Sequence, residues 1–370
     1  MHIKPFQAVF PNTDLITSAA TFFGTVKEEY PNYVQSGFFS KVAQEAIYVY
    51  QIREREHTYT GLVTCAAIED YLEGHIRKHE NTLPAKEQQQ IHLLLRRNAQ
   101  VKPVLLTYPP VEAIDAFTHD LIASKEPFLQ IRFEPEEDEV HTFWEIKDDG
   151  QIRLIQALFE QYVPYTYIAD GHHRTSTTAI MHHRQQNKPG GKLYDRFLCA
   201  LFPTSELEIL DFNRAVEGLN GHSPTQFMAL LSSIVQIEPL REVLRPRQKH
   251  EVVMNLNREW FALRWKKRIL RQYVDEEILL DVRLLNEWIL QPILGIDDVR
   301  EDARLRYVEG TRGLEGTTEK LVKSDDLVGF FLYPVSMEDF LHISDVEQVL
   351  PPKSTWFEPR MRNGLIVQEY

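Results

Sequence analysis

The stretch YTYIADGHHRTSTTAIMHHRQQ, residues 165–186, passes from an apolar run to a helix-forming run through a single glycine. Its first part, residues 165–170, is rich in aromatic and β-branched side chains and predicts a buried strand. Its second part, residues 174–186, predicts a helix. Gly171 lies between them, where a residue without a side chain permits a tight turn. The stretch therefore predicts a strand that turns directly into a helix.

Pairs of short apolar runs precede this stretch. Residues 46–52 and 60–67 are separated by charged residues, and residues 127–133 and 140–146 are separated by an acidic turn, EPEEDE. Such runs joined by polar turns predict antiparallel hairpins. Helices are also predicted over 84–99 and 152–162, and further buried strands over 101–110 and 194–202.

These elements predict an α+β chain in three parts. Residues 1–215 are expected to form a domain with a mixed sheet and flanking helices. Residues 216–320 are expected to be mostly helical, with Ser223 as the N-cap of their first helix and Pro224 at its first position. Residues 321–370 are expected to add a strand, a helix and a polar tail, PPKST, that returns to the first domain.

The composition is that of an ordinary folded chain. Hydrophobic residues make up 43% of the 370 residues and charged residues 26%, which excludes a disordered or fibrous protein. The formal net charge of −13 disfavours extended contact with nucleic acid. The two cysteines, Cys65 and Cys199, lie in apolar runs and exclude a disulfide framework. The sequence shows no export signal and no membrane-spanning stretch, so we expect a cytoplasmic protein with no membrane partner.

The polar residues that follow the strand at 165–170 are the strongest candidates for a functional site. The amides of a helix N-terminus and the guanidinium of Arg174 are suited to phosphate oxygens. A polar turn that only caps a helix is the alternative. The predicted phosphate-binding residues of this turn are Gly171, His172, His173, Arg174 and Thr175, and Asp170 is predicted to bind Mg²⁺ or to accept a proton as a catalytic carboxylate.

A second polar group, RKHENT at 77–82, precedes the helix predicted over 84–99. Several ionisable side chains in a row cannot all enter an apolar core unpaired, so they lie either in solvent or along a polar cleft. In a cleft, Glu80 could act as a general base and Arg77 could bind phosphate. We therefore include Arg77 among the phosphate-binding candidates, and His79 and Glu80 among the catalytic candidates.

Lys353, Ser354 and Thr355 form a third candidate group in the polar tail. A lysine followed by hydroxyl residues is typical of the end of a phosphate-binding P-loop. The glycines that precede such a lysine are missing, which excludes a Walker A motif. The three residues are predicted to bind phosphate in a tail that returns to the first domain. An ordered tail with hydroxyls that cap backbone groups is the alternative.

The histidines raise the question of a metal-dependent hydrolase. The chain has no HExxH pair, and His172 and His183 are too far apart in sequence to be neighbours on one helix turn. A metal site would require several segments to converge. Neither the G-x-S-x-G turn of α/β-hydrolases nor the G-x-G-x-x-G turn of dinucleotide-binding domains occurs.

Four motifs run along the chain: IKPFQAVFP near the start, RKHENT with the following KEQQQ, YIADGHHRTSTTA, and PPKSTWFEPRMRNGL near the end. Through them the chain resembles, from about residue 2 to 368, the bacterial family known only as domain of unknown function 1015, whose hallmark is the IADGHHR string. One departure is visible. The family usually carries a PPYDV-like segment where this chain reads SAATFFGTVKEEYPNYV, so no role of that segment is carried over.

Around the DGHHR turn this family is similar to the superfamily that joins sulfiredoxin, ParB-type nucleotide-binding domains and free-serine kinases. The resemblance implies a ParB/sulfiredoxin-like core in which the turn from Gly171 to Arg174 binds nucleotide phosphates. In the serine kinases an aspartate of this string and a separate glutamate assist transfer to the serine hydroxyl. This implies a catalytic or Mg²⁺-binding role for Asp170, and we assign the second carboxylate to Glu80.

Together these observations predict a nucleotide-dependent phosphotransferase that acts on a small hydroxyl-bearing metabolite such as free serine, with Mg²⁺ and ATP or ADP. Two other functions stay open: a non-catalytic nucleotide-binding regulatory protein, and a metal-dependent hydrolase. DNA binding is disfavoured, because the net charge is −13 and no basic stretch is interleaved with aromatic residues. The expected partners are a nucleotide and a small-molecule substrate.

Overall fold

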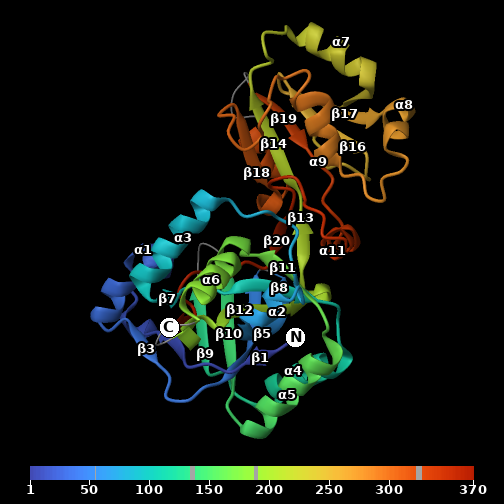
Figure 1. Cartoon of the computed structure of the whole chain (residues 1–370). Coiled ribbons are helices and arrows are strands. Elements are labelled where there is room, and N and C mark those ends of the chain that lie inside the picture. Colours follow the sequence, from blue (N-terminus) through green and yellow to red (C-terminus); the bar gives the residue numbers. More distant parts are fainter. Residues whose placement is uncertain (55, 134–137, 187–190, 322–326) are drawn as a thin grey trace. The chain divides into compact units, whose positions relative to one another are not determined.

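The computed structural model describes residues 1–370 with the exception of 55, 134–137, 187–190 and 322–326. The chain forms two compact units (Figure 1). Unit 1 contains Met1–Glu208 and Pro359–Tyr370, and unit 2 contains Ile209–Glu358. Unit 1 is therefore built from two separate parts of the chain, and unit 2 lies between them in sequence.

A nine-stranded mixed sheet is the centre of unit 1. Its strands follow the order β6-β11-β8-β12-β5-β4-β10-β9, and β1 also pairs with β5. The pairs β6–β11 and β8–β12 are parallel, and the other pairs are antiparallel. The strands are β1 (Ile3–Lys4), β4 (Ile47–Glu54), β5 (His57–Ala67), β6 (Ile76–Arg77), β8 (Val104–Tyr108), β9 (Leu129–Phe133), β10 (Glu139–Ile146), β11 (Thr166–Asp170) and β12 (Arg196–Pro203).

Six helices flank this sheet. Helices α4 and α5 pack against each other, and α3 packs against α6, which also contacts β8 and β12 (Figure 1). The helices are α1 (Ala19–Gln35), α2 (Ile68–Leu72), α3 (Pro84–Arg97), α4 (Glu112–Ser124), α5 (Asp149–Tyr162) and α6 (His172–Gln185). The predicted α+β class, with a mixed sheet and flanking helices, is confirmed.

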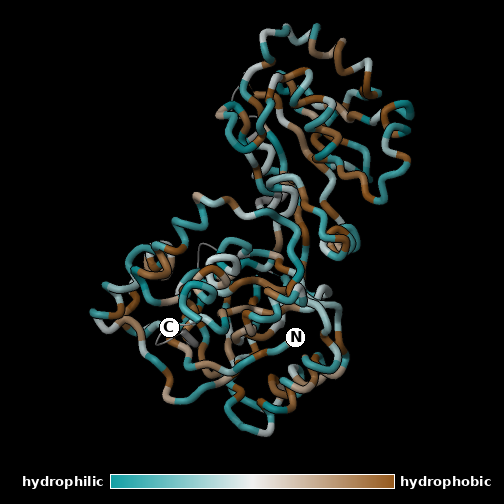
Figure 2. Tube along the Cα trace, viewed as in Figure 1, coloured by the Kyte–Doolittle hydropathy of each residue, from teal (hydrophilic) through white to brown (hydrophobic). Residues whose placement is uncertain are grey.

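The main core of unit 1 joins the sheet to its helices. Ile47 and Val49 of β4 belong to one buried cluster with Ile155 and Phe159 of α5. The two α5 residues are four positions apart and so lie on one face of that helix, while the two β4 residues alternate onto one face of the sheet. Figure 2 shows hydrophobic stretches along the interior strands.

Both predicted hairpins are present. Strands β4 and β5 pair antiparallel, with Tyr48 opposite Val63 and Glu54 opposite His57 at the turn. Strands β9 and β10 also pair antiparallel, with Phe133 opposite Glu139. Residues 134–137 of the predicted acidic turn lie outside the described residues.

A second, four-stranded sheet ties the end of the chain into unit 1. Its order is β3-β2-β21-β7, and all its pairs are antiparallel. The strands are β2 (Ala8–Pro11), β3 (Phe39–Lys41), β7 (Ala99–Gln100) and β21 (Val367–Glu369). The polar tail was predicted to return from residue 351. In the structure Pro359–Tyr370 belongs to unit 1, whereas residues 351–358 belong to unit 2.

Unit 2 contains a six-stranded antiparallel sheet with the order β15-β17-β16-β19-β14-β18. A two-stranded sheet, β13-β20, is formed separately. The elements of this part are β13 (Glu208–Leu210), β14 (Phe212–Glu217), α7 (Pro224–Ile234), β15 (Val235–Leu240), β16 (Glu251–Leu256), β17 (Glu259–Trp265), α8 (Lys267–Leu270), α9 (Asp281–Leu285), β18 (Leu305–Glu309), α10 (Gly313–Leu321), β19 (Leu327–Phe331), α11 (Met337–Asp345) and β20 (Trp356–Glu358).

Unit 2 differs from the mostly helical region that the sequence predicts over 216–320, because β15, β16, β17 and β18 lie there. The hairpin between β16 and β17 shows why it was missed. Asn257 and Arg258 at its turn both have positive φ angles, 51° and 65°, as a two-residue hairpin turn requires. The usual sequence signal of such a turn is Asn-Gly, and an arginine in its second position gives no such signal.

The start of the first helix in this region is as predicted. The Ser223 side chain accepts a hydrogen bond from the Gln226 backbone amide, and the Gln226 side chain accepts one from the Ser223 amide. Pro224 occupies the first helical position. This reciprocal arrangement satisfies two backbone donors at the helix end. Among the described residues, none of the helices combines the length and apolarity needed to cross a membrane.

A buried polar network holds the C-terminal segment against β10. The Arg362 guanidinium donates to the Glu139 carboxylate, with 3.2 Å between Nε and Oε2. His141 Nε2 lies 2.6 Å from Glu139 Oε1, and its Nδ1 lies 2.6 Å from the Tyr50 hydroxyl. Burial alone would raise the pKa of Glu139, but the hydrogen bonds from His141 and Arg362 lower that pKa to about 2.

Glu139→Gln tests this network. A carboxyl whose pKa is lowered by folding contributes stability above its ordinary pKa of 4.5 and loses that contribution as the pH falls toward about 2. We expect the original protein to have the larger free energy of unfolding at pH 7, with the gap to the variant narrowing between pH 4.5 and 2. Urea unfolding at a series of pH values measures this gap. A gap that stays constant would contradict a role for the ionised carboxylate.

Candidate functional site

The predicted strand-to-helix turn is present, with β11 ending at Asp170 and α6 beginning at His172. Gly171 forms the N-cap with a φ of +116°, a conformation that residues with a side chain rarely adopt. A Cβ atom at this position would lie 2.7 Å from Nη2 of Arg174. Glycine is therefore required both for the turn and for the position of the arginine. Because Gly171 has no side chain, the first amides of the helix donate no hydrogen bond to a capping side chain.

Asp170 binds two cations at this turn. Its Oδ2 lies 3.0 Å from Nη2 of Arg174 and 3.4 Å from Nζ of Lys102. Burial would raise the pKa of Asp170, but Lys102, Arg174 and Arg360 outweigh it and hold that pKa well below its ordinary value. The carboxylate is therefore ionised at neutral pH and already engaged with cations. That engagement argues against the predicted role as a Mg²⁺ ligand, because a dication would be repelled by the same neighbours.

Positive charge exceeds negative charge around the turn. Lys102 precedes β8, Arg174 lies in the first turn of α6, and Arg360 arrives with the C-terminal segment. Burial lowers the pKa of Lys102, Asp170 raises it, and Arg174 and Arg360 lower it further. Three cations thus act on one carboxylate. An anion bound here would reduce their mutual repulsion.

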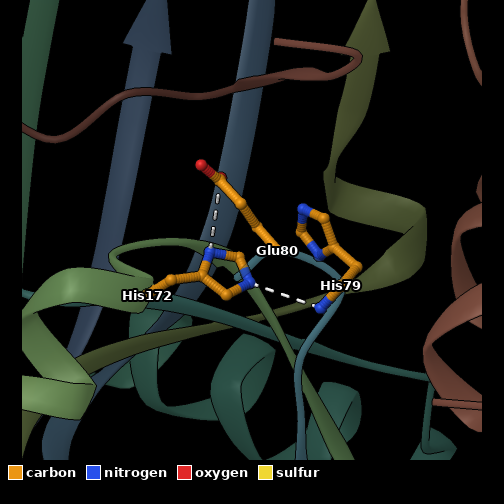
Figure 3. A group of neighbouring side chains, drawn as sticks. All are labelled: His79, Glu80 and His172. Atoms are coloured by element: carbon orange, nitrogen blue, oxygen red, sulfur yellow. Dashed lines mark hydrogen bonds and ion pairs between the residues drawn. The ribbon is translucent and has the colours of Figure 1, made fainter. Parts of the chain in front are cut away.

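A cluster of His79, Glu80 and His172 lies beside the turn (Figure 3). The parallel pairing of β6 with β11 causes this, because it carries the chain after Arg77 toward the same end of the sheet at which α6 begins. The backbone amide of His79 lies 3.4 Å from Nε2 of His172, and Nδ1 of His172 lies 3.9 Å from the Glu80 carboxylate. We call these three residues the histidine–glutamate cluster.

The two imidazoles of the cluster are neutral at physiological pH. Burial lowers the pKa of His172 to about 3, with His173, Arg174 and Lys78 acting in the same direction and Asp170 against it. Burial and His172 hold the pKa of His79 well below its ordinary value. The histidine rings are buried, whereas the Glu80 side chain is 48% exposed. His172 therefore contributes hydrogen bonding but no positive charge.

The cluster has the residue types and the spacing of a metal site, with candidate ligand atoms all within 4.8 Å of one another. The hydrogen bond at His172 argues against that use. Its Nε2 accepts from the His79 amide, so the ring proton is on Nδ1, the nitrogen that faces Glu80. A protonated nitrogen cannot bind a metal ion, and binding would require the other tautomer. The protonated Nδ1 of His172 faces the Glu80 carboxylate, and Glu80 is the member of the cluster that can accept a proton from a substrate.

The other predicted site residues of unit 1 make contacts outside the histidine–glutamate cluster. The Thr175 hydroxyl is buried and donates to the Gly171 carbonyl oxygen at 3.3 Å. The Arg77 guanidinium lies 4.3 Å above the ring centre of Tyr165. His173 acts electrostatically on Glu87 of α3, whose pKa is lowered mainly by hydrogen bonds from Ser176 and Thr82. These contacts join α3 to α6.

Lys353, Ser354 and Thr355 belong to unit 2, whereas the turn belongs to unit 1. The Ser354 hydroxyl donates to the Pro351 carbonyl oxygen at 2.5 Å, and Nη2 of Arg214 donates to the Lys353 carbonyl oxygen at 2.9 Å. The Lys353 ammonium lies 5.5 Å from the ring centre of Phe212. These contacts within unit 2 match the alternative of an ordered tail.

Sequence reasoning missed Lys102. The residue stands in VKPVLL, a single charge beside the buried strand β8. A charged residue at such a position needs a partner or a ligand, and this is the only local signal that points to it. Its partner, Asp170, is distant in sequence and is brought close by the pairing of β8 with β11.

Gly171→Ala and Gly74→Ala test the turn as a matched pair. Both glycines have positive φ, but a Cβ at Gly74 meets nothing within 4 Å. We expect each variant to lose about 1–2 kcal/mol of stability from backbone strain, and Gly171→Ala to lose more because it displaces Arg174. Urea unfolding measures both losses. Equal losses would show that the contact with Arg174 is unimportant.

The structure has remote likenesses among solved structures. A free serine kinase in complex with ADP has a TM-score of 0.40 and 12% identity, with coverage of 82% of this chain and 92% of that chain. SbnI with a C-terminal truncation, from Staphylococcus aureus, has a TM-score of 0.43 and 10% identity, with coverage of 81% and 85%. A conserved hypothetical protein from Pyrococcus furiosus has a TM-score of 0.39 and 11% identity, with coverage of 82% and 95%. At these values the likenesses carry no argument about function.

A family model matches a large part of the sequence. No curated protein sequence matches this chain. The model of the family described as "Protein of unknown function (DUF1015)" matches residues 8–285, about three quarters of the 370 residues. The family predicted from the order of the sequence motifs is thus the one whose model matches, and the chain belongs to the DUF1015 family.

Proposed function

We propose that this protein is a nucleotide-dependent phosphotransferase that moves a phosphoryl group to the hydroxyl of a small metabolite, with free serine as the first acceptor to test. The observation that supports it most is the convergence of Lys102, Arg174 and Arg360 on Asp170 at the start of α6, beside a neutral histidine–glutamate cluster. Phosphoryl transfer depends mainly on positioning and on neutralising phosphate charge. Groups that lie together in unit 1 would meet both requirements.

The turn would hold the phosphates of the nucleotide. The amides of the first turn of α6 and the side chains of Arg174, Lys102 and Arg360 supply donors and positive charge for phosphate oxygens. Asp170 would act as a positioning residue, because its ion pairs fix the directions of Arg174 and Lys102. Mg²⁺ would accompany the nucleotide and neutralise charge on its phosphates.

Glu80 would orient the acceptor hydroxyl and take its proton. The carboxylate is half exposed and so is accessible to a substrate, while Nδ1 of His172 lies 3.9 Å behind it. As the hydroxyl oxygen forms its bond to phosphorus, the bond from phosphorus to the nucleotide oxygen breaks, and the hydroxyl proton passes to Glu80. The nucleotide leaves with one phosphate fewer.

Glu80→Gln tests the proposed base. The amide keeps the size of the side chain but cannot accept the proton, so we expect turnover to fall at least 100-fold while the nucleotide dissociation constant changes by less than about threefold. Phosphorylated product is measured by mass spectrometry after incubation with serine, Mg²⁺ and either ADP or ATP. Glu73→Gln, at another exposed glutamate, is the control and should retain turnover.

Arg174→Ala tests the proposed phosphate contact. Loss of the guanidinium should weaken nucleotide binding at least tenfold, as measured by calorimetry. A wild-type protein that binds nucleotide but forms no phosphorylated product with any hydroxyl acceptor would favour the alternative of a non-catalytic nucleotide-binding regulator. Wild-type turnover in both variants would contradict the assignment of these residues.

A further inference from the structure

A cavity of about 280 Å³ lies in unit 1 beside α6. Its walls come from α1, α3, β7, the segment between β7 and β8, α6, and Asn363 of the C-terminal segment. Among the described residues, four basic side chains and no acidic ones line it. We call it the cation pocket, and its basic residues are Lys27, Arg97, Lys102 and Arg174.

The cation pocket and the histidine–glutamate cluster lie on opposite sides of α6. Arg174, Thr177 and Thr178 line the pocket and share one face, because they are spaced by three and four residues. His172 lies two residues before Arg174, and two residues turn an α-helix by about 200°. Lys27 and Arg97 line the pocket but do not belong to the cluster. The pocket therefore lies on the face of α6 opposite the cluster, and it includes Arg174 and Lys102 of the turn.

Two buried donors on the pocket wall lack partners among the described residues. The Thr177 side chain is 2% exposed, and its hydroxyl makes no hydrogen bond within the described part of the chain. Nε of Arg174 is likewise buried and unpaired there. The neighbouring Thr178 hydroxyl, by contrast, donates to the Arg174 carbonyl oxygen at 3.1 Å. Buried polar groups are nearly always hydrogen-bonded, so the two unused donors indicate a ligand that accepts.

Arg97 adds a positive charge, and within the described part of the chain its guanidinium donates to backbone carbonyl oxygens and not to a carboxylate. Its Nε donates to the Leu93 carbonyl oxygen at 3.0 Å, and its Nη1 donates to the Lys27 carbonyl oxygen at 3.3 Å. Burial lowers the pKa of Arg97 to about 10; Glu28 opposes that shift, and Arg174 adds to it. Two guanidiniums that repel each other on the wall of one cavity are stabilised by an anion between them.

We propose that the cation pocket binds a phosphate group of a small molecule, at a site separate from the histidine–glutamate cluster. The arrangement of donors around the pocket suits a phosphate better than a carboxylate. The donors come from four different segments around the cavity, and the tetrahedral oxygens of phosphate accept from many directions, whereas a carboxylate offers two oxygens in one plane. Binding here requires no turnover. The inference rests on the proposed function, because Lys102 and Arg174 are shared with the proposed nucleotide-phosphate contacts. It extends that phosphate site to Lys27, Arg97 and Thr177.

Calorimetry with inorganic pyrophosphate and inorganic phosphate tests this proposal. We expect saturable binding that weakens as the salt concentration rises, and at least tenfold weaker binding in Arg97→Gln. Arg96→Gln is the matched control, because Arg96 is the adjacent, exposed arginine of α3 and does not line the pocket. It should bind like the original protein. No saturable binding of either anion, or equal binding by Arg97→Gln, overturns the proposal.

Thr177→Val separates ligand binding from folding. Valine keeps the shape of threonine but removes the unpaired hydroxyl, so we expect an unchanged or higher melting temperature together with several-fold weaker pyrophosphate binding. A lower melting temperature with unchanged binding would show a structural role for the hydroxyl and contradict the proposal.

Two further measurements are needed. One identifies the source of the phosphate, and the other distinguishes failure of this proposal from failure of the proposed phosphoryl transfer. If ADP binding is also weakened at least tenfold by Arg97→Gln, the pocket takes a nucleotide phosphate; if only pyrophosphate or phosphate binding is weakened, it takes the free anion. Both results support a phosphate site. Glu80→Gln should bind pyrophosphate like the original protein. If the protein turns over substrate but binds no pyrophosphate, the proposed phosphate site in the cation pocket is wrong, whereas the proposed phosphoryl transfer still holds.

Discussion

The ion pairs of Asp170 are the interaction on which the candidate site depends. A single oxygen of this carboxylate lies 3.0 Å from the Arg174 guanidinium and 3.4 Å from the Lys102 ammonium. Without it, cations from α6 and from the start of β8 would repel each other in a partly buried setting. One carboxylate offsets only part of that repulsion, since Arg360 also acts on it. The remaining positive charge would favour an anion at the start of α6.

The turn itself could be predicted because its signals are local. Gly171 and the change from an apolar strand to a polar helix lie within one short stretch, and the structure places β11 and α6 there. The partners of the turn could not be predicted in the same way. Lys102 reaches Asp170 through the pairing of β8 with β11, and His79 reaches His172 through the pairing of β6 with β11. Strand order is a non-local property that periodicity does not report.

Sequence patterns were insufficient at two places in unit 2, for physical reasons. The strands of unit 2 were missed because the hairpin at Asn257 and Arg258 uses left-handed conformations without a glycine. The group at Lys353 was predicted from its polarity to join the turn. Within unit 2, the Ser354 hydroxyl donates to the Pro351 carbonyl oxygen and Arg214 donates to the Lys353 carbonyl oxygen, as the alternative of an ordered tail also requires. Polarity shows that hydrogen bonds are needed, but it does not show with which partners.

The split of unit 1 has a consequence for the order in which the protein matures during translation. Ribosomes release the chain from its N-terminal end, and domains generally fold as units while they emerge. The strand β21 and the charge of Arg360 both come from Pro359–Tyr370, which follow all of unit 2. Unit 2 can therefore complete its sheet while unit 1 still lacks a strand. The group of cations around Asp170 gains Arg360 only when synthesis has passed residue 360, after the whole of unit 2 has been made.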